Sequence, residues 1–241
     1  MEQSVFQRNF INAKNHWWWL ARKKILQEVI SKQIKKKENL NILDFGSGTG
    51  INVDLLQKFG EVYIYEPNEY ANKFLKLNFK NIISTEATLK NISIKFDLII
   101  LTDVLEHIES PISSLKNIRS LIKDSGKVII TVPAHNYLFT KKDTDLQHFR
   151  RYSKKTLKNN LESAKLKLDY FSYYNFFLSP LIIPITLIFK ILNNNHIDLA
   201  EKPPNSIINF LFFKIFSLEK FFISKYIKLP YGVSLFAVAT K

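Results

Sequence analysis

The sequence predicts an α/β protein in which helices cover both faces of a parallel sheet. Between residues 40 and 133, short apolar runs alternate with helical stretches, which is the pattern of repeated strand–helix units. The chain has 241 residues, of which 46% are hydrophobic, so it can bury a sizeable core. It contains no Cys and only six Gly, which excludes a disulfide framework, a Cys-based zinc site and a low-complexity protein.

The expected elements of this region follow from local patterns. Helices are expected over residues 17–34, 51–59, 69–79 and 111–123, where apolar residues recur with the helical repeat. Gly60 and Gly126 are expected to end two of these helices as left-handed caps. Strands are expected at the short apolar runs Leu40–Phe45, Val62–Glu66, Ile82–Ser84, Phe96–Leu101 and Lys127–Val132.

After residue 133 the pattern changes. No charged residue occurs between Tyr170 and Phe189. The expected elements here are a helix that Ser153 caps and that runs to about Ala164, a strand Lys167–Tyr174, an apolar helix Ser206–Ile227 and a final strand Val233–Thr240.

The formal net charge is +14, and the two ends of the chain carry it. Residues 1–40 hold nine basic and three acidic residues, residues 41–136 hold ten and eleven, and residues 137–241 hold sixteen and seven. An anionic partner such as nucleic acid, a phosphorylated substrate or a membrane surface would explain this excess. AT-biased codon usage is an equally good explanation, because thirty of the basic residues are Lys.

Three of the six glycines lie in one segment, NILDFGSGTG, between an expected strand and an expected helix. Gly46, Gly48 and Gly50 allow a sharp turn and a close approach of a ligand, at the place where open α/β sheets bind nucleotides. Their spacing is not the G-x-G-x-x-G of dinucleotide folds. Asp44 before the loop would repel a pyrophosphate but suits a ligand with an ammonium and a sulfonium group. Glu66, after the second strand, is placed to accept hydrogen bonds from ribose hydroxyls.

These segments resemble the motifs of the class I S-adenosylmethionine-dependent methyltransferases. NILDFGSGTG matches the first motif, YEP the acid after the second strand, and FDLIILTDVLEHIESP and SGKVIITVP the fourth and fifth strands. At the position that contacts adenine, this chain has Glu86 where Asp is usual. The resemblance implies S-adenosylmethionine as the cofactor, bound by Asp44, Gly46, Ser47, Gly48, Gly50, Glu66, Pro67, Glu86, Ala87 and Thr102.

The two ends of the chain are similar to a bacterial branch of these enzymes, in the segments HWWWLARKKIL, DLQHFRRYSKKTL and LPYGVSLFAVATK. The resemblance implies a Rossmann-like three-layer sandwich whose sheet has six parallel strands and an antiparallel last one. It implies one domain, composed of an N-terminal helical segment (1–39), a cofactor-binding core (40–175), an apolar helical insertion (176–231) and the final strand (232–241).

Methyl transfer to oxygen needs a general base near the carboxyl ends of the strands. His107, just after the fourth strand, is one candidate, although a structural role is the more favoured interpretation. His107 also follows Asp103 and Glu106 at a spacing that some quinone-pathway O-methyltransferases use for a divalent metal. Three ligands on one turn are geometrically awkward, and the alternative is that Glu106 caps the following helix. A metal is therefore weakly supported, and no metal ligand is assigned.

The second candidate is the segment DLQHFRRY, in which His148 would be the base and Asp145 a further catalytic residue. Arg150, Arg151 and Tyr152 are expected to bind an anionic acceptor, because the guanidinium fork grips a carboxylate or phosphate in a way that Lys cannot. The alternative is that these Arg residues pair with Asp145 or with Asp143 and only fix the loop.

Two apolar features flank the core. Trp17, Trp18 and Trp19 either close over the cofactor or pack the first helix on the sheet, and packing is the favoured role for at least two of them. The uncharged run contains Pro180 and Pro184, and both of its ends must return to one side of the sheet, so a shallow insertion is favoured over a bilayer span. On the helical wheel of residues 206–228, which cover the expected helix 206–227 and the residue after it, six polar residues fall on one arc, as in an interfacial helix: Lys214, Ser217, Lys220, Ser224, Lys225 and Lys228. A buried cap or a dimer surface would show a similar pattern.

The favoured function is methyl transfer from S-adenosylmethionine to a small or lipid-linked acceptor, at oxygen. One alternative is a membrane-surface binding protein that retains the fold without catalysis. Another is a nucleic-acid methyltransferase, which is less favoured because the chain lacks an N/D-P-P-Y/F motif and a catalytic Cys. The start of the chain shows no secretory signal, so a cytoplasmic location is expected, with contact to an anionic inner membrane face.

Overall fold

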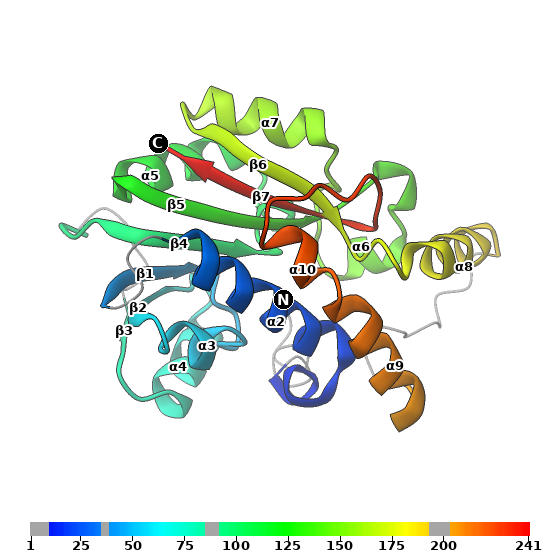
Figure 1. Ribbon diagram of the computed structural model, residues 1–241. Helices are drawn as coiled ribbons and strands as arrows, with labels where there is room; N and C mark the ends of the chain where they lie inside the picture. The colour runs from blue at the N-terminus through cyan, green and yellow to red at the C-terminus, as the bar shows by residue number, and fades with distance from the viewer. Residues whose placement is uncertain (1–9, 35–38, 85–91, 193–202) are drawn as a thin grey trace.

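The computed structural model describes residues 10–34, 39–84, 92–192 and 203–241. These residues form a seven-stranded sheet with the order β3-β2-β1-β4-β5-β7-β6 (Figure 1). β7 pairs antiparallel with both β5 and β6, and the remaining pairs are parallel, which confirms the predicted fold class. The strands are β1 (Leu40–Phe45), β2 (Gly60–Tyr65), β3 (Ile82–Ser84), β4 (Phe96–Thr102), β5 (Ile122–Pro133), β6 (Lys167–Tyr174) and β7 (Ser234–Thr240).

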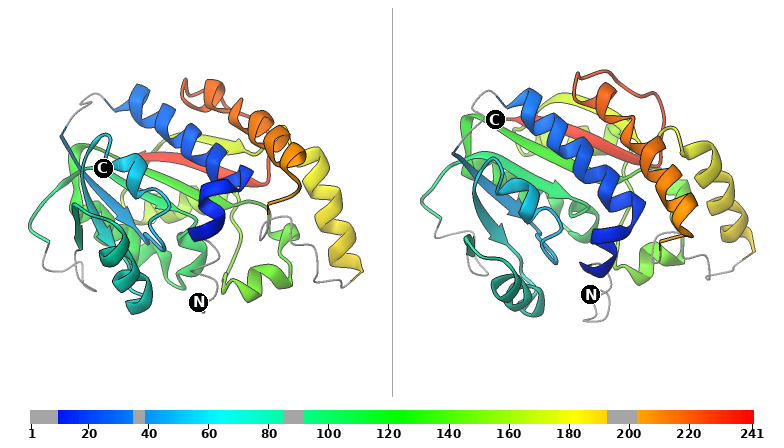
Figure 2. Two further views of the ribbon diagram at one scale, coloured as in Figure 1. Left: turned by 90° about the horizontal axis from the view of Figure 1, so that it is seen from below. Right: turned by 60° about the horizontal axis from the view of Figure 1, so that its bottom comes forward.

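Helices cover both faces of the sheet (Figures 1 and 2). Side chains alternate along each strand, so Ile42 packs into the core on one face and Leu43 into the core on the other. The first face carries α2 (Trp17–Gln33), α3 (Val53–Leu56), α4 (Glu69–Asn78), α9 (Ser206–Ser217) and α10 (Lys220–Ile223), and the second carries α5 (Pro111–Leu121) and α7 (Lys154–Ser163). At the carboxyl ends of the parallel strands lie η1 (Leu105–His107), η2 (Asn136–Leu138), α6 (Lys141–Asp145) and α8 (Ser179–Ile191).

Two glycine predictions are wrong. Gly60 and Gly126 do not cap helices, because they lie inside β2 and β5 and neither has a positive φ. What Gly60 provides is a close approach between strands: a Cβ there would lie 2.0 Å from the carbonyl oxygen of Leu40. The predicted cap of α7 is confirmed, since the Ser153 hydroxyl accepts a hydrogen bond from the Thr156 amide at 3.1 Å.

The predicted helix over residues 206–227 is interrupted. α9 ends at Ser217 and α10 begins at Lys220, because the amides of residues 218 and 219 bond to carbonyls three residues back instead of four. The buried Glu219 side chain at this turn accepts backbone hydrogen bonds from residues 175, 176 and 177. Ser217 and Ser224 are buried, so they do not share an exposed arc with the lysines. The single polar stripe is therefore a wrong prediction, although Lys214 and Lys225 are exposed.

Three helices, α8, α9 and α10, lie between β6 and β7 in the part of the chain that the structure describes. That this segment is an insertion relative to similar enzymes, with the boundaries 176–231, stays a prediction. None of the described helices is both long enough and apolar enough to cross a membrane.

Candidate active site

The loop after β1 has the backbone that its glycines predict. Gly46, Gly48 and Gly50 all have positive φ, at 75°, 55° and 77°. A Cβ on Gly46 would lie 2.7 Å from Cγ2 of Val104, whereas a Cβ on Gly48 would meet nothing within 4 Å. Gly48 therefore leaves open space beside the loop. Gly50 instead packs against α4, because a Cβ there would collide with Phe79 at 2.4 Å.

Two buried carboxyl groups lie next to this loop. Glu66 accepts hydrogen bonds from the amides of Gly48 at 2.7 Å and Asn68 at 2.9 Å, and burial raises its pKa. Burial and the nearby Glu66 raise the pKa of Asp44 to about 7. One oxygen of Asp44, Oδ2, has no hydrogen-bond partner among the described residues. A cationic group on a ligand would stabilise the ionised form of both acids, so the site fits an ammonium and sulfonium ligand with ribose hydroxyls.

A pocket of about 1300 Å³ opens over the loop and extends past α2 to α6, α8 and α9. Asp44 and Gly50 do not line it, since Asp44 is buried and Gly50 faces α4. Glu86 and Ala87 lie outside the described residues. The predicted cofactor residues that line the pocket are Gly46, Ser47, Gly48, Glu66, Pro67 and Thr102.

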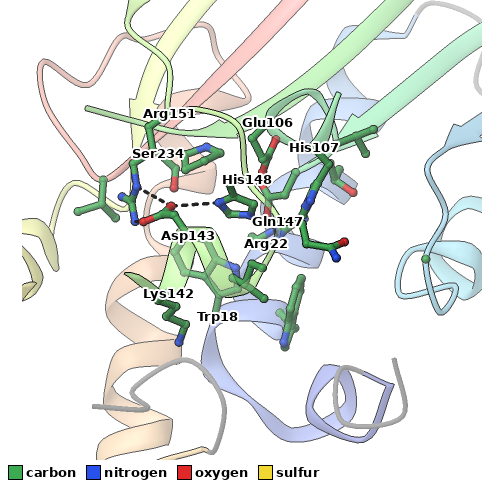
Figure 3. Close-up of a pocket in the computed structure, with 18 of the residues that line it drawn as sticks. Trp18, Arg22, Glu106, His107, Lys142, Asp143, Gln147, His148, Arg151 and Ser234 are labelled. Carbon is green, nitrogen blue, oxygen red and sulfur yellow. Dashed lines mark hydrogen bonds and ion pairs between the residues drawn. The ribbon is translucent and has the colours of Figure 1, made fainter. Parts of the chain in front are cut away.

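The pocket also contains a His–Asp–Arg chain (Figure 3). Nδ1 of His148 lies 3.0 Å from Oδ1 of Asp143. Arg151 donates to both oxygens of the same carboxylate, at 2.8 and 2.9 Å. Although burial opposes it, these contacts hold the pKa of Asp143 well below its usual range. The ionised Asp143 accepts the Nδ1 proton of His148, which leaves Nε2 as the basic nitrogen.

Next to His148 lie His107 and Glu106, on the turn after β4. The rings of His107 and His148 have centroids 4.6 Å apart, and burial together with His148 lowers the pKa of His107 to about 4. Glu106 is fully buried and neither of its carboxyl oxygens has a hydrogen-bond partner within the described residues. Ligand atoms of Glu106, His107 and His148 lie within 4.8 Å of one another, so this set could hold a divalent cation. We call these three residues the Glu106 cluster.

Three of the residues predicted for catalysis and substrate binding do not line the pocket. Tyr152 is a core residue, 1% exposed, whose hydroxyl donates to the carbonyl of Leu105 at 3.1 Å. Arg150 donates to the carbonyl of Glu109 at 2.8 Å, and Asp145 is exposed on the outer side of α6. We therefore correct the assignments of Asp145, Arg150 and Tyr152. The alternative in which an Arg–Asp pair fixes the loop is observed for Arg151 with Asp143.

Sequence reasoning missed Arg22 and Asn175, which line the pocket, and considered Asp103, which also lines it, only as a metal ligand. Arg22 forms an ion pair with Asp103, whose other oxygen accepts a hydrogen bond from Thr131 at 2.9 Å. Asn175 is buried, and its side-chain oxygen and nitrogen have no partner in the described structure. The rarity of Arg in a Lys-rich chain pointed to Arg150 and Arg151, and the same argument would have found Arg22. No local pattern marks Asn175.

The three tryptophans line the pocket and also pack. Trp17 meets the ring of Phe212 edge-on at 5.4 Å between centroids, and Trp18 stacks on Phe216 at 5.2 Å. Trp17 lies in the core cluster on the first face of the sheet and Trp18 packs against it, which agrees with the packing role predicted for at least two of them. Trp19 instead lies against the guanidinium of Arg22, 4.8 Å from the ring centroid.

Comparison with known proteins agrees with the fold and with this loop. Residues 18–170 match the methyltransferase domain family. The chain belongs to this family and is an S-adenosylmethionine-dependent methyltransferase.

Similar proteins include one sequence relative and several solved structures. Over 110 residues the chain is 33% identical to the tRNA U34 carboxymethyltransferase of Campylobacter fetus subsp. fetus, a match that covers 41% of this chain and 37% of that protein. A chain from a complex with the Haloferax volcanii Trm112 methyltransferase activator has a TM-score of 0.61 and 12% identity, with 97% of this chain and 93% of that chain covered. An S-adenosylmethionine-dependent methyltransferase from Archaeoglobus fulgidus has a TM-score of 0.53 and 20% identity, with 91% and 94% covered. These two structures support the fold alone.

Proposed function

We propose that this enzyme methylates an oxygen atom of a small or lipid-linked acceptor, with His148 as the general base. The observation that carries the proposal is the contact between His148 and Asp143, at the acceptor end of the same pocket that contains the glycine loop. A positioned base contributes about 10²–10⁴-fold to such a reaction. The pocket would also position the acceptor, which contributes about 7–11 kcal/mol in well-oriented systems.

The residues have distinct roles in this proposal. Arg151 holds Asp143, Asp143 fixes the proton of His148 on Nδ1, and Nε2 of His148 takes the proton of the acceptor hydroxyl. Bound S-adenosylmethionine supplies an electrophilic methyl group on a sulfonium. Glu66 would bind its ribose and Asp44 would stabilise its positive charge. His107 is neutral near pH 7 because its pKa is about 4, and it packs against His148.

We also propose that α8 and α9 associate with an anionic membrane surface. On α9, Ile207 and Phe210 are 72% and 56% exposed, and Lys214 on the same helix lies 5.1 Å from the ring of Phe210. An exposed apolar face next to basic residues is typical of helices that lie in the membrane interface. Vesicles with anionic lipid should bind the protein more strongly than neutral vesicles, and binding should weaken as salt is added. No binding to either kind of vesicle would refute this part of the proposal.

A second candidate is methylation of tRNA, and the sequence match to a tRNA-modifying enzyme favours it. The net charge of +14 is compatible with such a substrate. The match leaves more than half of this chain uncovered. Loss of catalysis, with binding at the membrane surface retained, is a further alternative.

One experiment separates these candidates. The enzyme is incubated with S-adenosylmethionine labelled in its methyl group, together with fractionated cell lipids, soluble metabolites or bulk tRNA. We expect label in the lipid or metabolite fraction, and we expect alkaline hydrolysis or ether-specific cleavage to locate it on oxygen. Label in tRNA would support the second candidate. Cofactor binding by calorimetry without transfer to any fraction would support the non-catalytic alternative.

A further inference from the structure

The acceptor end of the pocket continues into a region with apolar walls. One wall is α8, whose contributing residues recur with the helical repeat and therefore share a face. The other wall is α9, which contributes two residues one turn apart. We call this region the α8–α9 cleft, and its lining residues are Leu181, Ile182, Ile185, Phe189, Ile208 and Phe212.

We propose that the α8–α9 cleft binds the hydrocarbon chain of an amphiphilic acceptor, whose polar head extends from the cleft to His148. The inference rests on the proposed methyl transfer, because it names the substrate class of the same site. A purely polar acceptor would leave the six apolar side chains of the cleft in contact with water. A hydrocarbon chain would remove them from water, and the hydrophobic effect grows with the apolar area removed.

The length of the cleft sets the length of chain that it accommodates. Along α8 the lining residues run from Leu181 to Phe189, which are eight positions apart. At ~1.5 Å per residue the wall is about 12 Å long, which matches an extended chain of about ten carbons. Affinity should therefore rise with chain length up to about ten carbons and then level off.

The charges around the cleft indicate an anionic head. Arg22 and Arg151 in the pocket are each paired with an aspartate. Lys141 and Lys142 of α6 and Lys190 of α8 also line the pocket. The Lys190 ammonium donates a hydrogen bond to the carbonyl of Tyr137 at 2.7 Å. These three lysines favour a phosphate-type group between the chain and the methylated hydroxyl.

The outer face of the same helices indicates where the chain comes from. On α8, Pro180, Pro184, Ile188 and Ile191 are exposed, at positions that follow the helical repeat on the side away from the cleft. α8 is therefore apolar on its cleft face and on its outer face. A bilayer that covers the outer face would place the cleft beside its acyl chains, so a membrane lipid is the source of the acceptor that we infer.

Intrinsic fluorescence provides the first test, because all three tryptophans of the chain line the pocket and Trp17 contacts Phe212. The protein with bound S-adenosylmethionine is titrated with n-alkyl phosphates of four to fourteen carbons, each kept below its critical micelle concentration. We expect a saturable change in emission, with affinity rising about fourfold per methylene, or ~0.8 kcal/mol, up to about ten carbons. Terminally brominated decyl phosphate should quench the emission, and inorganic phosphate should have no effect. Affinity independent of chain length would overturn the proposal.

A matched pair of variants distinguishes the cleft from the outer face. Ile185→Asp places a carboxylate in the cleft, whereas Ile188→Asp makes the same change on the outer face of the same helix. We expect Ile185→Asp to weaken binding of decyl phosphate at least tenfold. Ile188→Asp should retain that affinity and lose binding to vesicles that contain anionic lipid. Equal affinities of the two variants for decyl phosphate would refute the cleft assignment.

A second cleft variant covers the case in which Ile185→Asp does not fold. Ile185→Phe fills the cleft with an apolar side chain, so it should fold and should shorten the chain of highest affinity by several carbons. An unchanged chain-length optimum would contradict the proposal. Calorimetry with S-adenosylmethionine is run in parallel. If the unmodified protein binds S-adenosylmethionine but not the alkyl phosphates, only the cleft assignment is refuted. If it does not bind S-adenosylmethionine, the proposed function is refuted.

Discussion

Replacing Asp143 tests whether His148 acts as a base. In the variant Asp143→Asn the side chain keeps its shape but loses its charge. If the amide donates to Nδ1, His148 carries its proton on Nε2 and can no longer accept one from the acceptor. We expect kcat to fall by about 10²–10⁴-fold, the range that a general base contributes. That fall corresponds to ~2.7–5.4 kcal/mol of transition-state stabilisation.

The same change removes the anion that Arg151 binds. Both of its hydrogen bonds to Asp143 are short, at 2.8 and 2.9 Å, and the Asp143 side chain is only 2% exposed. Breaking a buried pair of this kind costs about 3–5 kcal/mol. For a chain of 241 residues, an unfolding entropy of ~0.5 kcal/mol/K converts this loss into a fall in Tm of about 6–10 °C.

The assay must therefore separate chemistry from stability. Turnover is measured as release of S-adenosylhomocysteine in single-turnover conditions, well below the Tm of the variant and with the acceptor fraction identified for the unmodified enzyme. Asp145→Asn is the matched control, because Asp145 lies on the same helix but is exposed and outside the pocket. It should change turnover and Tm little. The reasoning is refuted if Asp143→Asn retains turnover within threefold of the unmodified enzyme while its Tm falls.

Three further outcomes can be measured. Gly46→Ala should weaken cofactor binding at least tenfold by calorimetry, since its Cβ would meet Val104 at 2.7 Å; an affinity within twofold of the unmodified protein would show that the loop adapts. Zn²⁺ should inhibit turnover by binding the Glu106 cluster, and Glu106→Gln should reduce that inhibition, because it removes the carboxyl ligand; equal inhibition of both proteins would place Zn²⁺ elsewhere. Burial raises the pKa of Glu219 to about 7, above its unfolded value, so its contribution to stability is complete at low pH and is lost as pH rises through 7. Tm should fall from pH 6 to pH 8 and fall less in Glu219→Gln; identical pH profiles would contradict the raised pKa.

Most of the fold could be predicted because it depends on which residues are buried, and the pattern of apolar residues in the sequence indicates them. β1 and β3 have the bounds that their apolar runs predicted, and the antiparallel β7 followed from the family resemblance. The cap prediction for Gly60 failed because the role of this residue depends on Leu40 of the neighbouring strand β1, which lies twenty residues earlier in the chain. The burial of Glu219 between α9 and α10 also involves distant residues, because its side chain accepts hydrogen bonds from the backbone before α8. Hydrophobic periodicity contains no information on such partners.

The site shows the same division. The glycine loop and Glu66 could be found because a local backbone shape and a strand end determine their positions. The segment that contains His148 could be found from its rare residue types. The sequence does not show which acid accepts the hydrogen bond of His148. Asp143 and Asp145 are two positions apart on a helix of only five residues, so one faces the pocket and the other faces outward. Only the orientation of α6 at the sheet edge decides between them.

The structure shows which parts of the molecule carry the excess positive charge. The central residues 41–136 carry −1, and the described lysines around the acceptor end come from α6 and α8, which lie beyond them. Codon usage could supply many lysines, but it would not select apolar residues for both the cleft face and the outer face of α8. An apolar outer face is unfavourable in water, because each exposed Val, Leu or Ile side chain forgoes about 1.5–3 kcal/mol of burial. The presence of such a face on the helix that lines the pocket is best explained if a membrane surface covers this face and also supplies the lipid substrate.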